Sequence, residues 1–275
     1  MQNILKHLHQ FYNMPTIYHT SNAALQYNQT NNMIDYYLDN NTPPTAKFLT
    51  ESPITRILSE NELSALYFLI DIQDILVRYS YYENNTFISN TDDVYLEANL
   101  KYHNAITINW SGAPANANKM EVQIFDIAGD ELTEIRYFIR AESTCIENQI
   151  VWLNKLGGYD SFMFTGGLET SITAIKETEI EFPFNTNFLS PYPITSYRSI
   201  NSNKQIKIAH RCANNETAQW LKNDLINSAD IYIVEDLVYK PVLMQDANVG
   251  YNSYSKEFIV TFNLKYAFPI NIQTR

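Results

Sequence analysis

Short runs in which apolar and polar residues alternate are the feature that most constrains this fold. Residues 94–100 place an apolar side chain at every second position, and residues 106–110 and 135–139 repeat the pattern. A period of two residues is typical of a β-strand that packs one face on a core and exposes the other. Turn-forming residues such as those at 128–130 separate the runs. The sequence therefore predicts a mainly β protein built from antiparallel sheets, with the apolar residues of each run on the buried face.

The alternation also predicts two packed domains. It breaks over residues 142–148 and then restarts, so we place a boundary near residue 145. Residues 1–145 would form an N-terminal β-sandwich domain with a short N-terminal arm or helix, and residues 146–275 would form a second sandwich or barrel-like domain. Because no Gly/Ser-rich or Pro-rich linker marks the boundary, we expect the two halves to pack closely.

One short helix is expected in the second domain, over residues 215–228. Asn215 suits the N-cap position, since its side chain can accept a hydrogen bond from the first turn. Ala218, Leu221 and Leu225 recur at helical spacing beside Trp220. This stripe predicts one apolar face that packs on the sheet.

Residues 183–204 lack strand periodicity and are predicted to form a long loop. They contain three prolines together with several aromatic side chains. A loop of about 20 residues is uncommon in a compact domain and usually has a function. Its rings would be buried either by a neighbouring subunit or by folding back on their own domain. The first alternative predicts an interface formed by Phe184, Phe188, Tyr192 and Tyr197.

The composition argues against nucleic-acid and membrane partners. The formal charge of −11 leaves few cations to hold phosphates in a sequence-specific complex, and no stretch reaches the roughly 18 apolar residues of a membrane span. Lys6, His7 and His9 interrupt the first apolar stretch, so we expect no signal peptide. We therefore expect Cys145 and Cys212 to be free thiols.

Candidate catalytic groups are few. Glu179 and Glu181 lie two residues apart on an expected strand, which would bring two carboxylates towards a glycosidase-like separation, although a solvated strand face is the simpler interpretation. His210 and Cys212 share a strand face and would place a base near a thiol, but a buried cysteine beside a surface histidine explains them as well. We expect no enzymatic activity.

A metal site is not expected either. His7 and His9 would need further ligands from elsewhere in the chain, and the remaining histidines and cysteines do not cluster. No phosphate-binding glycine motif is present. The sequence thus predicts no metal and no cofactor.

Residues 150–166, IVWLNKLGGYDSFMFTG, predict a well-formed hairpin. The turn would use Gly157 and Gly158, and the second strand would carry Phe162 and Phe164 on one face. Leu156 and Tyr159 would pack the turn onto a core.

This hairpin, together with FLTESPITRIL at 48–58 and ELSAL at 62–66, resembles β-sandwich virion proteins of tailed phages and prophages of Bacteroidota. The resemblance covers about residues 16–170 and is most specific over 152–166. The C-terminal third is similar in pattern to tail-tube and distal-tail β-sandwiches. These families are structural, so the resemblance implies a non-enzymatic subunit with no catalytic residues to carry over.

The resemblance gives an expected role in the virion of a tailed phage, after synthesis in the host cytoplasm. The subunit would self-associate into a hexameric or twelvefold ring in the tail, neck or baseplate and would contact other virion proteins. The 20 Tyr and 14 Phe suit such contacts. The alternative is a receptor- or carbohydrate-binding tail module that uses exposed Trp and Tyr, and a hydrolase based on Glu179 and Glu181 is a third hypothesis.

Overall fold

The computed structural model describes residues 46–70, 74–95, 104–141, 148–181, 195–212, 214–254, 257–268 and 270–271. The described chain is mainly β, as the alternation predicts, and its sheets do not close into a barrel. The strands are β1 (Ala46–Phe48), β2 (Thr55–Leu58), β3 (Ser64–Ile70), β4 (Ile75–Glu83), β5 (Thr86–Tyr95), β6 (Asn104–Ile108), β7 (Lys119–Asp126), β8 (Arg136–Arg140), β9 (Asn148–Leu153), β10 (Tyr159–Phe164), β11 (Leu168–Glu181), β12 (Thr195–Cys212), β13 (Ile231–Glu235), β14 (Val238–Asn252), β15 (Glu257–Tyr266) and β16 (Ile270–Asn271).

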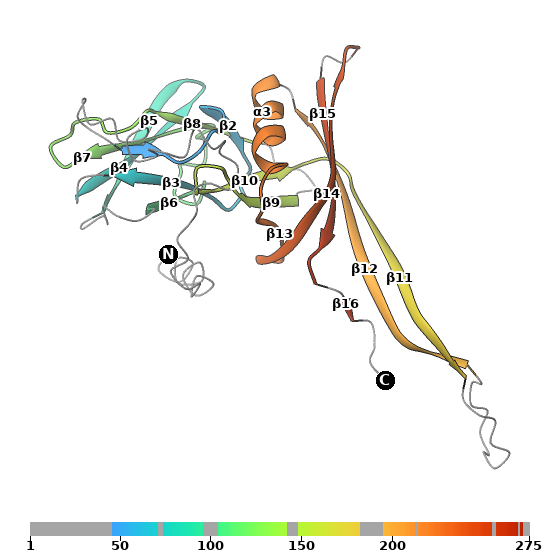
Figure 1. Ribbon diagram of the computed structural model, residues 1–275. Helices are drawn as coiled ribbons and strands as arrows, with labels where there is room; N and C mark the ends of the chain where they lie inside the picture. The colour runs from blue at the N-terminus through green and yellow to red at the C-terminus, as the bar shows by residue number, and fades with distance from the viewer. Residues whose placement is uncertain are drawn as a thin grey trace, which may run out of the picture.

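The first eight strands form a sandwich of two sheets around one core (Figure 1). One sheet has the order β1-β3-β6 and the other has the order β2-β8-β7-β4-β5. In β4, every second residue from Ile75 to Tyr81 is buried, so this strand packs one face on the core. Ile106 and Ile108 of β6 meet this face from the opposite sheet. Burial of these branched and aromatic side chains is the main stabilising contribution to the sandwich.

Strand β8 differs from the prediction in two respects. It pairs in parallel with β2, whereas the other strand pairs of the described chain are antiparallel. Its buried residues are Arg136 and Phe138, while Ile139 is 42 % exposed, so the predicted buried face was wrong. The cause is polar: the Arg136 guanidinium donates to the carbonyls of Thr50 and Ser52 and pairs with Glu134, which satisfies a charge at an inward position.

The later strands form a single eight-stranded sheet with the path β10-β9-β13-β14-β15-β12-β11, and β16 pairs with β12 beside it. A helix α3 (Asn215–Trp220) continues into one π-helical turn, η2 (Leu221–Leu225), and covers one face of this sheet (Figure 1). Ala218, Leu221 and Leu225 are fully buried there, which confirms the predicted stripe. Asn214 caps the helix by accepting a hydrogen bond from the Thr217 N–H, so the prediction of Asn215 as N-cap was wrong by one residue.

The predicted loop 183–204 is a strand over its described part, residues 195–204. These residues belong to β12 and pair with β11 from Glu181 opposite Thr195 to Leu168 opposite Ile208. The two strands form a ribbon that extends far beyond the rest of the sheet (Figure 1). The prediction failed because the segment TSYRSINSNK carries few apolar residues and shows no alternation of apolar and polar positions.

Candidate functional site

The hairpin β9–β10 is the structural junction between the sandwich and the large sheet. Its strands belong to the large sheet, while its turn packs against Leu49 and Tyr67 of the sandwich. Gly157 has a φ of +89°, a conformation that glycine adopts without strain. A Cβ on Gly158 would lie 2.8 Å from the Leu49 carbonyl oxygen and 2.9 Å from the Tyr67 Cβ. The turn therefore needs glycine at both positions: Gly157 allows the left-handed backbone conformation, and Gly158 allows the close approach of the sandwich.

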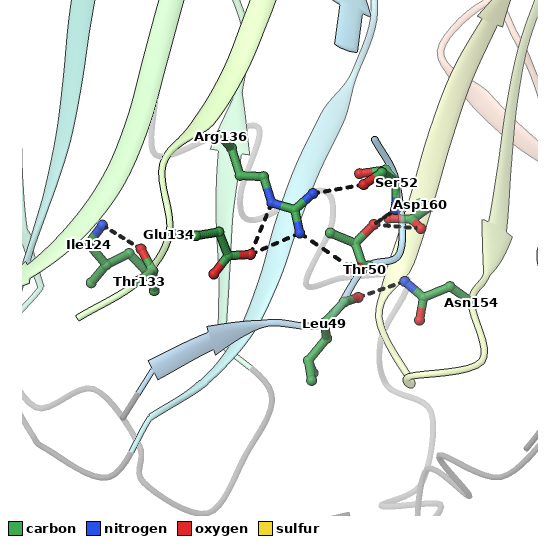
Figure 2. Close-up of polar contacts among 9 residues, drawn as sticks. All are labelled: Leu49, Thr50, Ser52, Ile124, Thr133, Glu134, Arg136, Asn154 and Asp160. Atoms are coloured by element: carbon green, nitrogen blue, oxygen red, sulfur yellow. Dashed lines mark hydrogen bonds and ion pairs between the residues drawn. The ribbon is translucent and has the colours of Figure 1, made fainter. Parts of the chain in front are cut away.

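Asn154 fixes this turn from inside. Its side-chain oxygen accepts hydrogen bonds from the N–H groups of Leu156 and Gly158, each at 3.0 Å. Its amide donates to the Leu49 carbonyl at 2.7 Å, so the same side chain shapes the turn and holds it on the sandwich (Figure 2). Asn154 is 1 % exposed, and a buried polar group of this kind is stabilising only when its partners are all present.

The segment that follows Leu49 is held from two sides (Figure 2). From β10, Asp160 accepts a hydrogen bond from the Thr50 hydroxyl at 2.9 Å. From β8, Arg136 donates to the Ser52 carbonyl at 2.8 Å. The chain between β1 and β2 is thus tied both to its own sandwich and to the large sheet.

A buried ion pair forms the second contact across the junction. Arg56 of β2 donates to Glu62 at 3.0 Å and to the Ser161 carbonyl at 2.5 Å, and the Ser161 hydroxyl donates to the same Glu62 oxygen. The guanidinium lies 5.1 Å from the centre of the Trp220 ring of α3. Removing one member of a buried pair leaves the other charge uncompensated, which is costly. Sandwich, hairpin and helix therefore share one polar network.

Two further buried carboxyl groups, those of Asp160 and Asp224, lie in the same junction. Asp224 of η2 accepts from the Trp152 indole at 3.1 Å and from the Lys155 N–H at 3.2 Å. Burial, and then the nearby Asp224, raise the pKa of Asp160 to about 7, although Arg56 opposes the shift. Burial likewise raises the pKa of Asp224. Burial thus favours the neutral form of both carboxyl groups.

This carboxyl pair is suited to a structural role. Asp160 and Asp224 are each only 2 % exposed, so a substrate has no access to their oxygens. Their hydrogen-bond partners come from within the junction, and they position the hairpin against the segment 49–52 and against η2. Neither residue was predicted from the sequence. The available signal was Asp160 itself, a charged residue inside an otherwise apolar strand, whereas nothing near Asp224 in the sequence points to the hairpin.

The ribbon β11–β12 is the second distinctive feature. Strand β11 is the last strand of the sheet order, and β15 pairs with β12 only over 205–212. Beyond that point β16 pairs with Asn201 and Ser202, and within the described chain no strand lies along the outer edge of 195–200. The last residue of β12 that pairs with β15 is Gln205, which lies opposite Ser171 of β11. From Ser171 to Glu181 the ribbon continues for about 33 Å, at about 3.3 Å per residue. Its two edges carry backbone groups that can pair with another chain.

The residues proposed as an interface are divided by this geometry. Phe184, Phe188 and Tyr192 lie outside the described residues. Tyr197 lies on β12 opposite Glu179 of β11, so it belongs to a strand and not to a loop. Glu179 and Glu181 lie on β11 as predicted, opposite Tyr197 and Thr195. Neither fact tests the interface or a hydrolytic role.

His210 and Cys212 lie on one face of β12, where Cys212 is buried and His210 is half-buried. The His210 ring meets the Phe162 and Phe164 rings edge-to-face, and burial lowers its pKa to about 4. Cys212 is a buried free thiol whose pKa burial raises to about 11. A protonated thiol is a poor nucleophile, so this pair is not arranged for thiol catalysis. Cys145, His7 and His9 lie outside the described residues.

A shallow hollow of about 300 Å³ lies near the base of the ribbon, lined by Lys204, Glu235, Tyr239, Lys240, Pro241, Tyr266 and Phe268. Its polar groups already bind one another. Lys204 donates to the Tyr266 hydroxyl at 3.1 Å, and Tyr266 and Lys240 both donate to Glu235. Lys204 is therefore occupied within its own subunit.

Among the described residues, no three or more His, Cys, Asp or Glu side chains come together in a group that would hold a metal ion. The described part of the chain also contains no helix with the length and apolar character needed to cross a membrane. All three tryptophans are buried: Trp110, Trp152 and Trp220 are at most 5 % exposed. A sugar-binding platform of exposed tryptophan, as the alternative function expected, is thus not available.

Comparison with known proteins adds no identification. No family model matches the chain. A search of curated proteins also finds no match.

Proposed function

We propose that this chain is a non-enzymatic structural subunit that works by self-association, as a ring in the tail, neck or baseplate of a tailed phage. The observation that carries the proposal is the ribbon β11–β12, which extends from the sheet with outer edges that are largely unpaired among the residues that the structure describes. A two-stranded ribbon is at best marginally stable alone in water, so a partner that covers it would stabilise it. Natural proteins usually shorten or cover such edges.

The polar chemistry of the junction also favours a structural role. Its charged groups are buried and directed at one another, and they join the sandwich to the large sheet. The virion context comes from the resemblance of residues 48–66 and 150–166 to phage structural proteins. The acidic balance of −11 suits a wall past which DNA slides without binding.

Light scattering of the purified protein at micromolar concentration tests self-association. We expect a mass that is a multiple of 31.9 kDa, with a hexamer or a twelvefold ring as the expected species, or assembly on addition of the neighbouring virion protein. Mass spectrometry of purified phage particles tests the location. A protein that stays monomeric and is absent from particles would contradict the proposal.

A receptor- or carbohydrate-binding module remains the second candidate because of one exposed aromatic site. Tyr254 is 98 % exposed beyond the end of β14, and nearby Tyr251 is 57 % exposed and packs on Phe258 with ring centres 4.9 Å apart. Exposed rings of this kind suit a sugar face or a protein contact. A glycan-binding screen that loses its signal in the double variant Tyr251→Ala and Tyr254→Ala would favour this candidate.

A further inference from the structure

The turn between β14 and β15 presents one fully exposed aromatic ring. Tyr254 is 98 % exposed, more than any other large apolar side chain that the structure describes. Its backbone N–H donates to the Asn252 side chain at 3.0 Å, and nearby the Tyr251 and Phe258 rings pack together. These contacts hold the base of the turn, so the Tyr254 ring projects into solvent from a supported position.

The hollow of about 300 Å³ lies at the opposite end of the same two strands (Figure 1). Tyr239, Lys240 and Pro241 lie near the start of β14, and Tyr266 ends β15. Strand β15 has 10 residues, so at about 3.4 Å per residue the hollow is about 30 Å from Tyr254. A side chain does not span this distance, so Tyr254 has access only to the hollow of another copy.

The hollow has the size and the walls that a phenol ring requires. A cavity of about 150 Å³ accommodates a benzene ring, and the volume here is about 300 Å³. Tyr239, Pro241 and Phe268 supply apolar surface, and Phe268 is itself 70 % exposed. A ring that enters the hollow removes apolar surface of both partners from water.

The polar groups of the hollow suit the hydroxyl of an entering tyrosine. Lys240 donates to Glu235, and its side chain is 40 % exposed, so the ammonium group is accessible. An ammonium group has three N–H donors, which allows Lys240 to donate to a further acceptor. A phenol hydroxyl in the hollow would accept such a bond, and hydrogen bonds from a charged donor are stronger than neutral ones.

We propose that Tyr254 of one copy inserts into the hollow of the next copy, head to tail. The contact joins two different surfaces of the same chain, so a pair of subunits still has one free tyrosine and one free hollow. Such heterologous contacts continue until they close, and closure produces a ring. The inference rests on the proposed self-association and specifies a contact that acts together with the edges of the ribbon, so that assembly requires both.

Two single substitutions remove the two halves of the contact. Tyr254→Ala removes the ring and keeps the hollow, whereas Phe268→Asp keeps the ring and places a charge in the wall of the hollow. Both side chains are mostly exposed, so we expect unchanged thermal unfolding midpoints. In light scattering, we expect each variant alone to appear as the 31.9 kDa monomer.

A mixture of these two variants tests the head-to-tail pairing. Tyr254 of the Phe268→Asp subunit fits the hollow of the Tyr254→Ala subunit, and the two surfaces left over cannot extend the chain. We therefore expect a one-to-one heterodimer with twice the 31.9 kDa mass and no ring.

The variant Tyr254→Phe separates the ring from its hydroxyl. It keeps the apolar burial and loses a hydrogen bond to a charged group, so we expect the dissociation constant of the assembly to rise at least about tenfold. Phe87→Ala is the matched control, because it removes another ring, 55 % exposed on β5 of the sandwich. This control should assemble as the wild type does.

The outcomes separate this inference from the proposed function. If the wild type is monomeric, with or without its neighbouring protein, the self-association proposal itself fails. If the wild type assembles and either single variant assembles equally well, the tyrosine contact is wrong while self-association stands. A mixture that stays monomeric, or that forms a ring, would also overturn the head-to-tail pairing.

Discussion

Asp160 is the residue whose environment departs most from that of an ordinary carboxyl group. Its folded pKa of about 7 lies above the unfolded value of about 4. The folded state therefore binds the Asp160 proton more tightly than the unfolded state does. This difference stabilises the fold fully below about pH 4, and the stabilisation is lost as the pH rises towards 7. Asp224 favours the neutral form and Arg56 favours the charged form. Burial outweighs the cation.

The variant Asp160→Asn tests this titration. The amide keeps an oxygen that can accept from Thr50 but cannot ionise. As the pH rises from 4 to 7.5, we expect the free energy of unfolding of the wild type to fall relative to that of the variant, because only the wild type ionises at this position. Urea unfolding at four pH values measures the difference. A difference that is independent of pH would show that Asp160 does not titrate in this range.

Leu237 is a second residue whose contribution to stability can be tested, because its backbone conformation is unfavourable. It has a φ of +62° in the two-residue turn between β13 and β14, and it is 77 % exposed. A left-handed conformation costs a β-carbon-bearing residue about 1–2 kcal/mol. We expect Leu237→Gly to raise the free energy of unfolding by about 1 kcal/mol, less the entropy that glycine adds to the unfolded chain. The control Val238→Gly, at the start of β14, should lower it.

At the scale of elements, the turn of the β9–β10 hairpin is the most sensitive position. Gly158→Ala would place a Cβ within 3 Å of backbone and side-chain atoms of the sandwich. We expect the free energy of unfolding to fall by about 1–3 kcal/mol, the usual cost of overpacking. Gly167→Ala is the matched control, because nothing lies within 4 Å of its Cβ position. Denaturant unfolding of both variants checks the contrast, and equal effects would contradict a tight junction.

The sequence predicted those elements whose determinants are local. Strand β6 follows from the alternation over 106–110, since a core must receive every second side chain, and the helix follows from the spacing of Ala218, Leu221 and Leu225. The buried face of β8 could not be predicted, because the Arg136 guanidinium donates hydrogen bonds to carbonyls that are distant in the sequence. The distal part of β12 was missed for a related reason: residues 195–204 pair with β11, and their own sequence pattern does not reveal this pairing. The carboxyl pair was missed because Asp160 and Asp224 meet only after folding.

At the scale of the whole molecule, two cores are joined by a polar junction, and a ribbon extends outward from the sheet (Figure 1). The junction fixes how the sandwich and the large sheet pack within a subunit. Under the proposed function, the edges of the ribbon offer backbone hydrogen-bonding groups to a neighbour. Internal rigidity and an external contact surface are together what a ring-forming subunit requires.

Removing the ribbon tests the central claim most directly. Thr173 and Asn203 lie opposite each other, so replacing residues 174–202 with Asn-Gly closes a short hairpin and leaves both cores and Lys204 in place. Sedimentation velocity would compare this variant with the full chain. We predict that the full chain sediments as a ring and the shortened chain as a monomer with an unchanged thermal midpoint. A shortened chain that still forms the ring would contradict the account.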